Sequence, residues 1–274
     1  MSEEFKARPV HLTPISLSLL FGILCTYLIL LSPTEHYNVA PLPEGLFGAF
    51  GNACYFVILV GVGATLLYLL LKNKNHKMIT IITAFALTTA IFTLSFIYLF
   101  AAFSLFPFPF MDFVALILSA SITALADFAM FKIRSRICSL IVISLGGALG
   151  AFLGTSIPTL STIFILCFLV IYDMFAVYHG PVGKIARNGL EKLHGLSFSF
   201  KNIQMGLGDL TFYSMLSGHM FINFGFLSCS ASVIGILVGC FLSFKMLEKK
   251  GMLPGLPFPI ILGLTLSLLV TLLI

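Results

Sequence analysis

The sequence predicts an all-α membrane protein with nine transmembrane helices, and composition and patterning lead to this prediction. Apolar residues make up 59% of the chain and charged residues only 9%, whereas a soluble domain has roughly 25% charged residues. The mean hydropathy is +1.11. The apolar runs are continuous rather than alternating, which excludes a β-barrel. Because a bilayer core needs about 20 apolar residues per helix, the length leaves room for about ten spans.

Each expected span is an apolar run between short polar segments. The first run begins near Thr13 and is too long for the apolar region of a signal peptide, so we expect it to be a span. The region 137–178 is too long for one span, which indicates a turn at Gly154–Pro158. The nine spans are expected at residues 14–32, 47–71, 78–103, 111–131, 137–155, 157–178, 204–222, 226–246 and 255–274.

The positive charges predict the orientation of the chain. With nine spans, all 15 Lys and Arg residues fall on one side, in the N-terminal tail, three loops and the end of the eighth span. The positive-inside rule then places the N-terminus in the cytoplasm and the C-terminus outside. The net charge of +5 therefore indicates contact with anionic lipid rather than nucleic acid. We expect a multi-pass protein of the cell membrane.

We divide the chain into an N-terminal membrane bundle, residues 1–156, and a catalytic membrane bundle, residues 157–274. The second contains a cytoplasmic loop, residues 179–203, which is expected to lie at the lipid surface. No metal or cofactor is expected. The six cysteines lie in apolar runs without a C-x-x-C pair, and the chain lacks an H-E-x-x-H motif.

Two acidic residues inside the spans are the candidate catalytic groups. Asp173 lies about five residues before the cytoplasmic end of span six, and Asp209 about five residues after the start of span seven. At about 1.5 Å per residue, both are expected at the same depth, roughly 7–8 Å from the interface. Charged groups in hydrocarbon are costly and commonly functional. The spacing therefore predicts a carboxylate pair.

Such a pair can hydrolyse a peptide bond. Two carboxyls a few Å apart at low dielectric cannot both ionise, so they share one proton. The ionised carboxyl can take a proton from water as the water attacks the peptide carbonyl, and the protonated carboxyl can donate to the carbonyl oxygen.

The spacing alone leaves other interpretations open. The two acids could each serve a separate structural role, or line an ion pathway in a transporter or channel. Asp127 on span four is a third acid, for which a salt bridge or an interfacial position beside Lys132 is the favoured interpretation. Ser217 and His219 lie close together in sequence but on different helix faces, and no Gly-x-Ser-x-Gly elbow is present, so a serine protease is not favoured.

Three motifs distinguish between these hypotheses. The motifs are Tyr172-Asp173 on span six, Gly206-Leu207-Gly208-Asp209 on span seven and Pro254-Gly255-Leu256-Pro257 before span nine. Together they resemble the presenilin and signal peptide peptidase family of intramembrane aspartyl proteases, with contexts closer to presenilin. The resemblance is sharp over about residues 165–274, and in the first five spans it extends only to number and hydropathy.

The resemblance implies an aspartic endopeptidase that cleaves transmembrane segments, including signal peptides, with Asp173 and Asp209 as the catalytic pair. It also implies that Pro254–Pro257 lines the site. We assign Tyr172, Gly206, Leu207, Gly208, Pro254, Gly255, Leu256 and Pro257 to substrate binding. Gly206 and Gly208 are expected to let spans six and seven approach closely, and the loop could bind an extended substrate by strand addition.

Two features depart from the family pattern. Gly255 stands where the family usually has Ala, and the loop between spans six and seven is short. The compact chain looks like an archaeal homologue that acts without obligatory accessory subunits, and both a monomer and a homo-oligomer remain open. A prepilin-type peptidase also carries Gly-x-Gly-Asp, but Tyr172-Asp173 and the Pro254–Pro257 loop argue against it.

Overall fold

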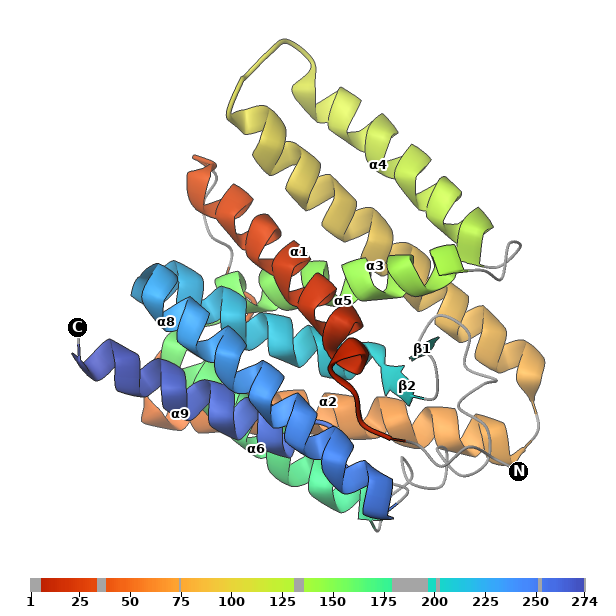
Figure 1. The fold of residues 1–274 in the computed structure, drawn as a ribbon. Helices are drawn as coiled ribbons and strands as arrows, with labels where there is room; N and C mark the ends of the chain where they lie inside the picture. The colour runs from red at the N-terminus through yellow and green to blue at the C-terminus, as the bar shows by residue number, and fades with distance from the viewer. Residues whose placement is uncertain are drawn as a thin grey trace.

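The computed structural model describes a bundle of α-helices with one short β-hairpin (Figure 1). The described residues are 6–33, 38–73, 75–130, 136–178, 197–200, 203–250 and 253–273. A single 3₁₀ turn, η1, precedes the first helix. The elements are η1 Pro9–Leu12, α1 Thr13–Leu31, α2 Leu46–Lys72, α3 His76–Ser104, α4 Met111–Phe128, α5 Arg136–Ser156, α6 Thr159–Tyr178, β1 Ser197–Phe200, β2 Ile203–Gly206, α8 Leu207–Lys250 and α9 Pro257–Leu273.

The helices confirm the predicted all-helical membrane fold. Within the described residues, 7 helices are long and apolar enough to cross a bilayer, and the shorter α9 is also apolar. The chain is thus a multi-pass membrane protein. The predicted turn between spans five and six is present, since α5 ends at Ser156 and α6 begins at Thr159. The count of nine spans and the orientation stay predictions.

Helix α8 covers both the seventh and the eighth predicted span. It continues through residues 207–250 but contains Gly225 with φ 83° and ψ −177°, a non-helical conformation. This region of backbone space is open almost only to glycine. Figure 1 shows that the helix reverses direction as its colour passes from cyan to blue. The two arms of α8 therefore form an antiparallel hairpin.

The start of the seventh span was predicted three residues too early. Residues 203–206 form strand β2, which pairs antiparallel with β1 so that Phe200 lies opposite Ile203 and Ser197 opposite Gly206. The apolar run had suggested a helix from residue 204, because hydropathy alone does not reveal a strand pair. Helix α8 begins at Leu207.

The first arm of α8 lies in the centre of the bundle. Its neighbours include α5, where glycines recur at positions 146, 147, 150 and 154 and allow close backbone contact. A Cβ on Gly150 would lie 2.5 Å from the Cβ of Ser214, and one on Gly154 would lie 2.9 Å from the backbone nitrogen of His219. Close contact with α5 therefore fixes the position of α8 and of the residues at its start.

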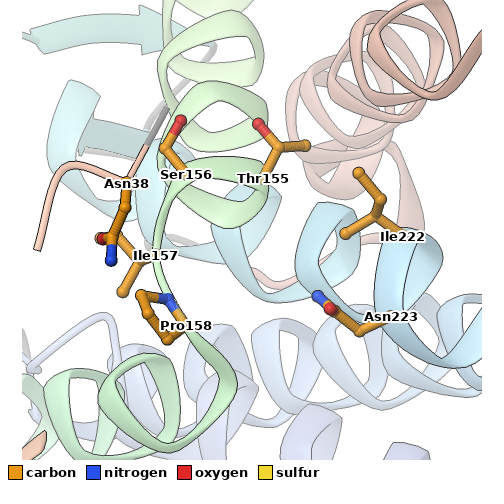
Figure 2. A pocket seen from close by; sticks show the side chains of 7 residues that line it. All are labelled: Asn38, Thr155, Ser156, Ile157, Pro158, Ile222 and Asn223. Carbon is orange, nitrogen blue, oxygen red and sulfur yellow. The ribbon is translucent and has the colours of Figure 1, made fainter. Parts of the chain in front are cut away.

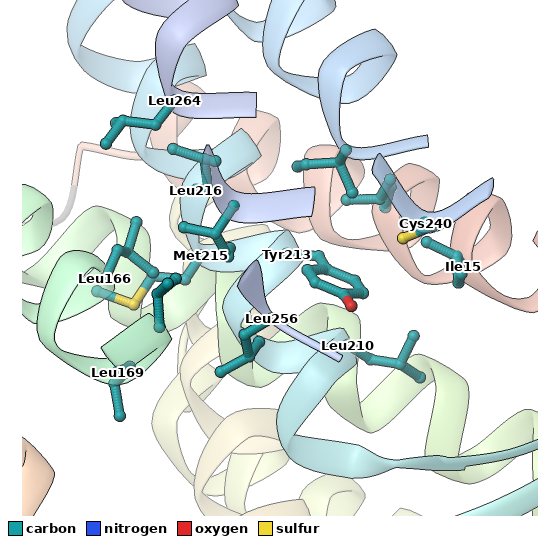
Figure 3. Close-up of a cluster of buried hydrophobic side chains, with 14 of the residues drawn as sticks. Ile15, Leu166, Leu169, Leu210, Tyr213, Met215, Leu216, Cys240, Leu256 and Leu264 are labelled. Atoms are coloured by element: carbon teal, nitrogen blue, oxygen red, sulfur yellow. The ribbon is translucent and has the colours of Figure 1, made fainter. Parts of the chain in front are cut away.

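A buried apolar cluster joins α8 to its other neighbours (Figure 3). It includes Ile15 of α1, Leu166 of α6, Leu216 of α8 and Leu264 of α9. Tyr213 lies within this cluster and is 1% exposed. At the periphery, α4 packs on α3 at the edge of the bundle (Figure 1). The catalytic candidates thus belong to the well-packed part of the molecule.

Candidate active site

Asp173 and Asp209 lie near the ends of α6 and α8. Asp173 is five residues before the last residue of α6, Tyr178, and Asp209 is the third residue of α8. The backbone N–H of Gly206, just before α8, donates to the Asp209 carboxyl. A carboxylate in the first turn of a helix that accepts from the preceding backbone is the acidic half of a capping box. This local interaction orients Asp209 at the start of the helix.

The segment between α8 and α9 brings the two carboxyls together. The backbone N–H of Leu256 donates to Oδ2 of Asp173 at 2.9 Å. A Cβ on the adjacent Gly255 would lie 2.9 Å from Oδ1 and 3.0 Å from Oδ2 of Asp209. Both carboxyls therefore contact consecutive residues of one loop, and they interact electrostatically with each other. Asp173, Asp209, Gly255 and Leu256 form a single site.

The glycines of the Gly-x-Gly-Asp motif do not serve the close helix contact that we had expected. Among the described residues, a Cβ on Gly206 would have Asp209 and Gly208 as its nearest neighbours, with Oδ2 of Asp209 at 3.8 Å. Of the residues that the structure describes, a Cβ on Gly208 would meet only the ring of Phe212, at 3.9 Å. The prediction of a close approach to α6 is therefore wrong. Gly206 instead lies beside the Asp209 carboxyl.

The other predicted substrate-binding residues contact different parts of the bundle. Leu207 packs toward α5, where a Cβ on Gly146 would lie 3.4 Å from its Cδ1. The Tyr172 ring lies near Gly61 of α2, 3.5 Å from where a Cβ would be. Pro254 and Pro257 are buried, and Pro257 is the first residue of α9. Only Gly255 and Leu256 of the loop have a described contact with the aspartates.

Tyr213 is a residue of the site that the sequence analysis did not single out. Its hydroxyl donates to the carbonyl oxygen of Gly255 at 2.8 Å. The signal was present in the spacing, because Tyr213 follows Asp209 by four residues, and residues four apart share one face of a helix. Neither the hydropathy of the sequence nor the motifs take that four-residue spacing into account. The β-hairpin, which ends at Gly206, is a second feature that was missed.

The third intramembrane acid, Asp127, lies in a separate place between α3 and α4. Oγ1 of Thr88 donates to its Oδ2 at 2.8 Å, and its Oδ1 is buried without a hydrogen-bond partner among the described residues. The salt bridge expected with Lys132 lies outside the described residues. Asp127 has no described contact with the loop that joins Asp173 and Asp209.

A cavity of about 290 Å³ lies at the opposite end of α6 from Asp173 (Figure 2). Pro158 precedes α6 and lines this cavity, so some 15 residues, or about 22 Å of helix, separate it from Asp173. The cavity is therefore distinct from the aspartate site. Its lining residues are Asn38, Thr155, Ser156, Ile157, Pro158, Ile222 and Asn223. Within the described part of the chain, no cluster of His, Cys, Asp and Glu fits a metal ion.

The fold and the site together define a polytopic helical membrane protein with a carboxylate pair inside its bundle. Two solved structures of a presenilin family intramembrane aspartate protease share this fold. One has a TM-score of 0.67 at 18% identity and covers 96% of this chain and 99% of its own. The other has a TM-score of 0.65 at 20% identity and covers 94% of this chain and 96% of its own.

A sequence comparison leads to the same family. Presenilin-B of Dictyostelium discoideum is 34% identical over 122 residues, which are 40% of this chain and 25% of that protein. The match thus spans a quarter of the length of this curated relative. No protein-family model matches the chain. The resemblance to presenilins that the motifs predicted is confirmed at the level of the fold and of this shared segment, while an archaeal origin stays a prediction.

Proposed function

We propose that the chain is an intramembrane aspartyl endopeptidase that hydrolyses peptide bonds within transmembrane segments, including those of signal peptides. The single observation that carries this proposal is the contact of Asp173 and Asp209 with consecutive residues of one loop. The fold adds support, because structures with the same arrangement of helices are presenilin-family intramembrane aspartate proteases.

The proposed chemistry uses one ionised and one protonated carboxyl. The ionised carboxyl takes a proton from a water molecule as the water oxygen attacks the peptide carbonyl carbon. The protonated carboxyl donates to the carbonyl oxygen and stabilises the tetrahedral intermediate. Collapse of the intermediate breaks the C–N bond, and the amine leaves with a proton from the site.

The backbone around the aspartates is suited to a substrate that has left its helical form. Helical carbonyls are already hydrogen-bonded, so a substrate helix must unwind before water can attack it. Strand β2 ends at Gly206, three residues before Asp209, and the Pro254–Pro257 loop contacts both aspartates. An extended substrate could add to this backbone as a strand. We place Tyr172, Leu207 and Gly208 around the same cleavage site.

The proposal includes a location and a set of partners. The charge distribution supports an active site toward the cytoplasmic leaflet, supplied with water from that side. Substrates reach the site laterally from the lipid. We expect that no accessory subunit is obligatory, and the proposal holds for a monomer or a homo-oligomer.

Single Asp173→Asn and Asp209→Asn substitutions test the proposal. The purified protein in detergent is expected to cleave a transmembrane peptide, with the products identified by mass spectrometry. Each substitution should lower the rate by at least about 100-fold, because it removes a general acid or base. Asp127→Asn is the matched control, since it changes another intramembrane Asp without a described contact to the site, and it should leave cleavage unchanged.

Ion-flux measurements on the same variants decide against the alternative. A wild-type protein that cleaves no such peptide, with flux through proteoliposomes that changes in Asp173→Asn and Asp209→Asn, would replace the protease by a transporter or channel. Equal loss of cleavage in all three Asp variants would show that the effect is not specific to the proposed pair.

A further inference from the structure

Tyr213 carries a polar group into an apolar part of the bundle. It lies on the first arm of α8 and is 1% exposed, within the cluster that also contains Leu256 and Cys240 (Figure 3). A phenylalanine would supply the same ring to this cluster. A buried phenol requires a hydrogen-bond partner, because an unsatisfied hydroxyl costs free energy in apolar surroundings. The presence of the hydroxyl is therefore explained by its hydrogen-bond partner rather than by the packing of the ring.

That partner belongs to the loop at the aspartate site. The hydroxyl of Tyr213 donates to the carbonyl oxygen of Gly255 at 2.8 Å. The thiol of Cys240, on the second arm of α8, hydrogen-bonds to the same hydroxyl. The Gly255 carbonyl is thus the strong acceptor for the hydroxyl, and the thiol is a weakly bonding neighbour.

The two hydrogen bonds at Gly255 and Leu256 involve a single peptide unit. The carbonyl of Gly255 and the N–H of Leu256 belong to one planar amide, and in a trans peptide they point in opposite directions. The carbonyl accepts from Tyr213 on α8, and the N–H donates to Oδ2 of Asp173 on α6 at 2.9 Å. Hydrogen bonds to α8 and to α6 therefore fix the orientation of this one amide plane.

We propose that Tyr213 is a positioning residue of the aspartate site, which acts through the Gly255–Leu256 peptide. By binding the carbonyl, its hydroxyl fixes the plane so that the Leu256 N–H points at Asp173 and the Gly255 Cα stays against Asp209. Loss of the hydroxyl lets the plane rotate and changes the surroundings of both carboxyls together. This inference rests on the proposed protease function for its catalytic consequence, but not for its structural one.

The kinetic test compares Tyr213→Phe with a matched control, Tyr98→Phe. Tyr98 also donates its hydroxyl to a backbone carbonyl, that of Ala148, at 2.7 Å, but in a different apolar cluster. Tyr213→Phe is expected to lower kcat roughly two- to tenfold, the effect of one lost hydrogen bond, with KM little changed. Tyr98→Phe should lose similar thermal stability and keep the wild-type kcat. Equal kcat values in the two variants would reduce Tyr213 to a packing residue.

Hydrogen exchange tests the structural part without any cleavage. The Leu256 amide proton should exchange faster in Tyr213→Phe than in wild type, while Tyr98→Phe leaves its protection unchanged. Unchanged protection in Tyr213→Phe would overturn the inference whether or not the enzyme is active. A wild-type protein without cleavage, combined with faster exchange in Tyr213→Phe, would reject the proposed function and retain the positioning role.

Discussion

At the scale of single residues, the contacts of Gly255 show what its departure from the family pattern changes in the site. The family that the chain resembles usually has Ala at this position. In the structure, a methyl group here would lie 2.9–3.0 Å from the carboxyl atoms of Asp209, which is closer than ordinary van der Waals contact. The Asp209 carboxyl thus occupies the space that a methyl group would fill. The position of the Asp209 carboxyl therefore depends on having glycine at residue 255.

Gly255→Ala is expected to lower activity without a comparable loss of stability. The new methyl group must displace either the Asp209 carboxyl or the loop, and a shift of about 1 Å at a reacting group can cost up to 100-fold in rate. The same substitution reduces the entropy of the unfolded chain, which favours folding by about 0.4–1 kcal/mol. Peptide cleavage and thermal unfolding in detergent measure the two effects.

The opposite outcome has a clear meaning. If Gly255→Ala cleaves faster than wild type, the carboxyl position beside Gly255 is a resting position, and displacement toward the substrate activates it. A fall in stability that parallels the fall in activity would instead assign the effect to the packing of the loop.

At the scale of elements, the hairpin of α8 depends on one glycine. Gly225 has φ 83° and ψ −177°, and a Cβ there would meet no atom of the described residues within 4 Å. Space is therefore no obstacle to a side chain, but backbone conformation is. Replacement of Gly225 therefore tests the cost of backbone conformation without the steric clash that usually accompanies the replacement of a glycine.

Gly225→Ala is expected to destabilise the fold by about 1–3 kcal/mol, the cost of a non-glycine residue in this region of backbone space. Gly63→Ala is the matched control, because Gly63 lies within α2 and a Cβ there also meets no described residue within 4 Å. Alanine in a helix interior should be neutral or stabilising by up to about 1 kcal/mol. Thermal unfolding in detergent compares the two, and equal midpoints would contradict a conformational role for Gly225.

The helices and the β-hairpin also show which elements can be predicted from the sequence and which cannot. The long apolar runs predicted the helices well because each span must satisfy its own backbone hydrogen bonds in lipid. The β1–β2 hairpin was missed because its pairing is a contact between two strands of four residues each, too short for a periodic pattern. The seventh span was consequently placed across residues that belong to β2.

At the scale of the whole molecule, the site depends on contacts that the sequence pattern does not contain. Motifs identified both aspartates and the loop, since each motif is local. The contact between Leu256 and Asp173 joins residues 83 positions apart, and Tyr213 meets Gly255 across 42. These contacts exist because α8 reverses at Gly225 and α9 packs beside it. The assembly of the site is therefore a property of the fold.

The overall arrangement also leads to a test of orientation. The N–H of Ala7 donates to Glu248 near the end of α8, and Asp173 near the end of α6 binds the loop that follows α8. The N-terminal segment and the aspartate site thus lie toward one end, where the positive charges are predicted to face the cytoplasm.

Reporter fusions in a bacterial host measure this orientation. A fluorescent protein that folds only in the cytoplasm should be bright when fused after Asn73, in the turn between α2 and α3, and dark after Ile274. Alkaline phosphatase, active only outside the cytoplasm, should give the reverse pattern. Bright fluorescence at both positions requires an even number of spans between Asn73 and Ile274, whereas the nine-span prediction places seven spans there, so this result would contradict it. A complete reversal would place the aspartates toward the outer leaflet, so that water reaches the site from the other side.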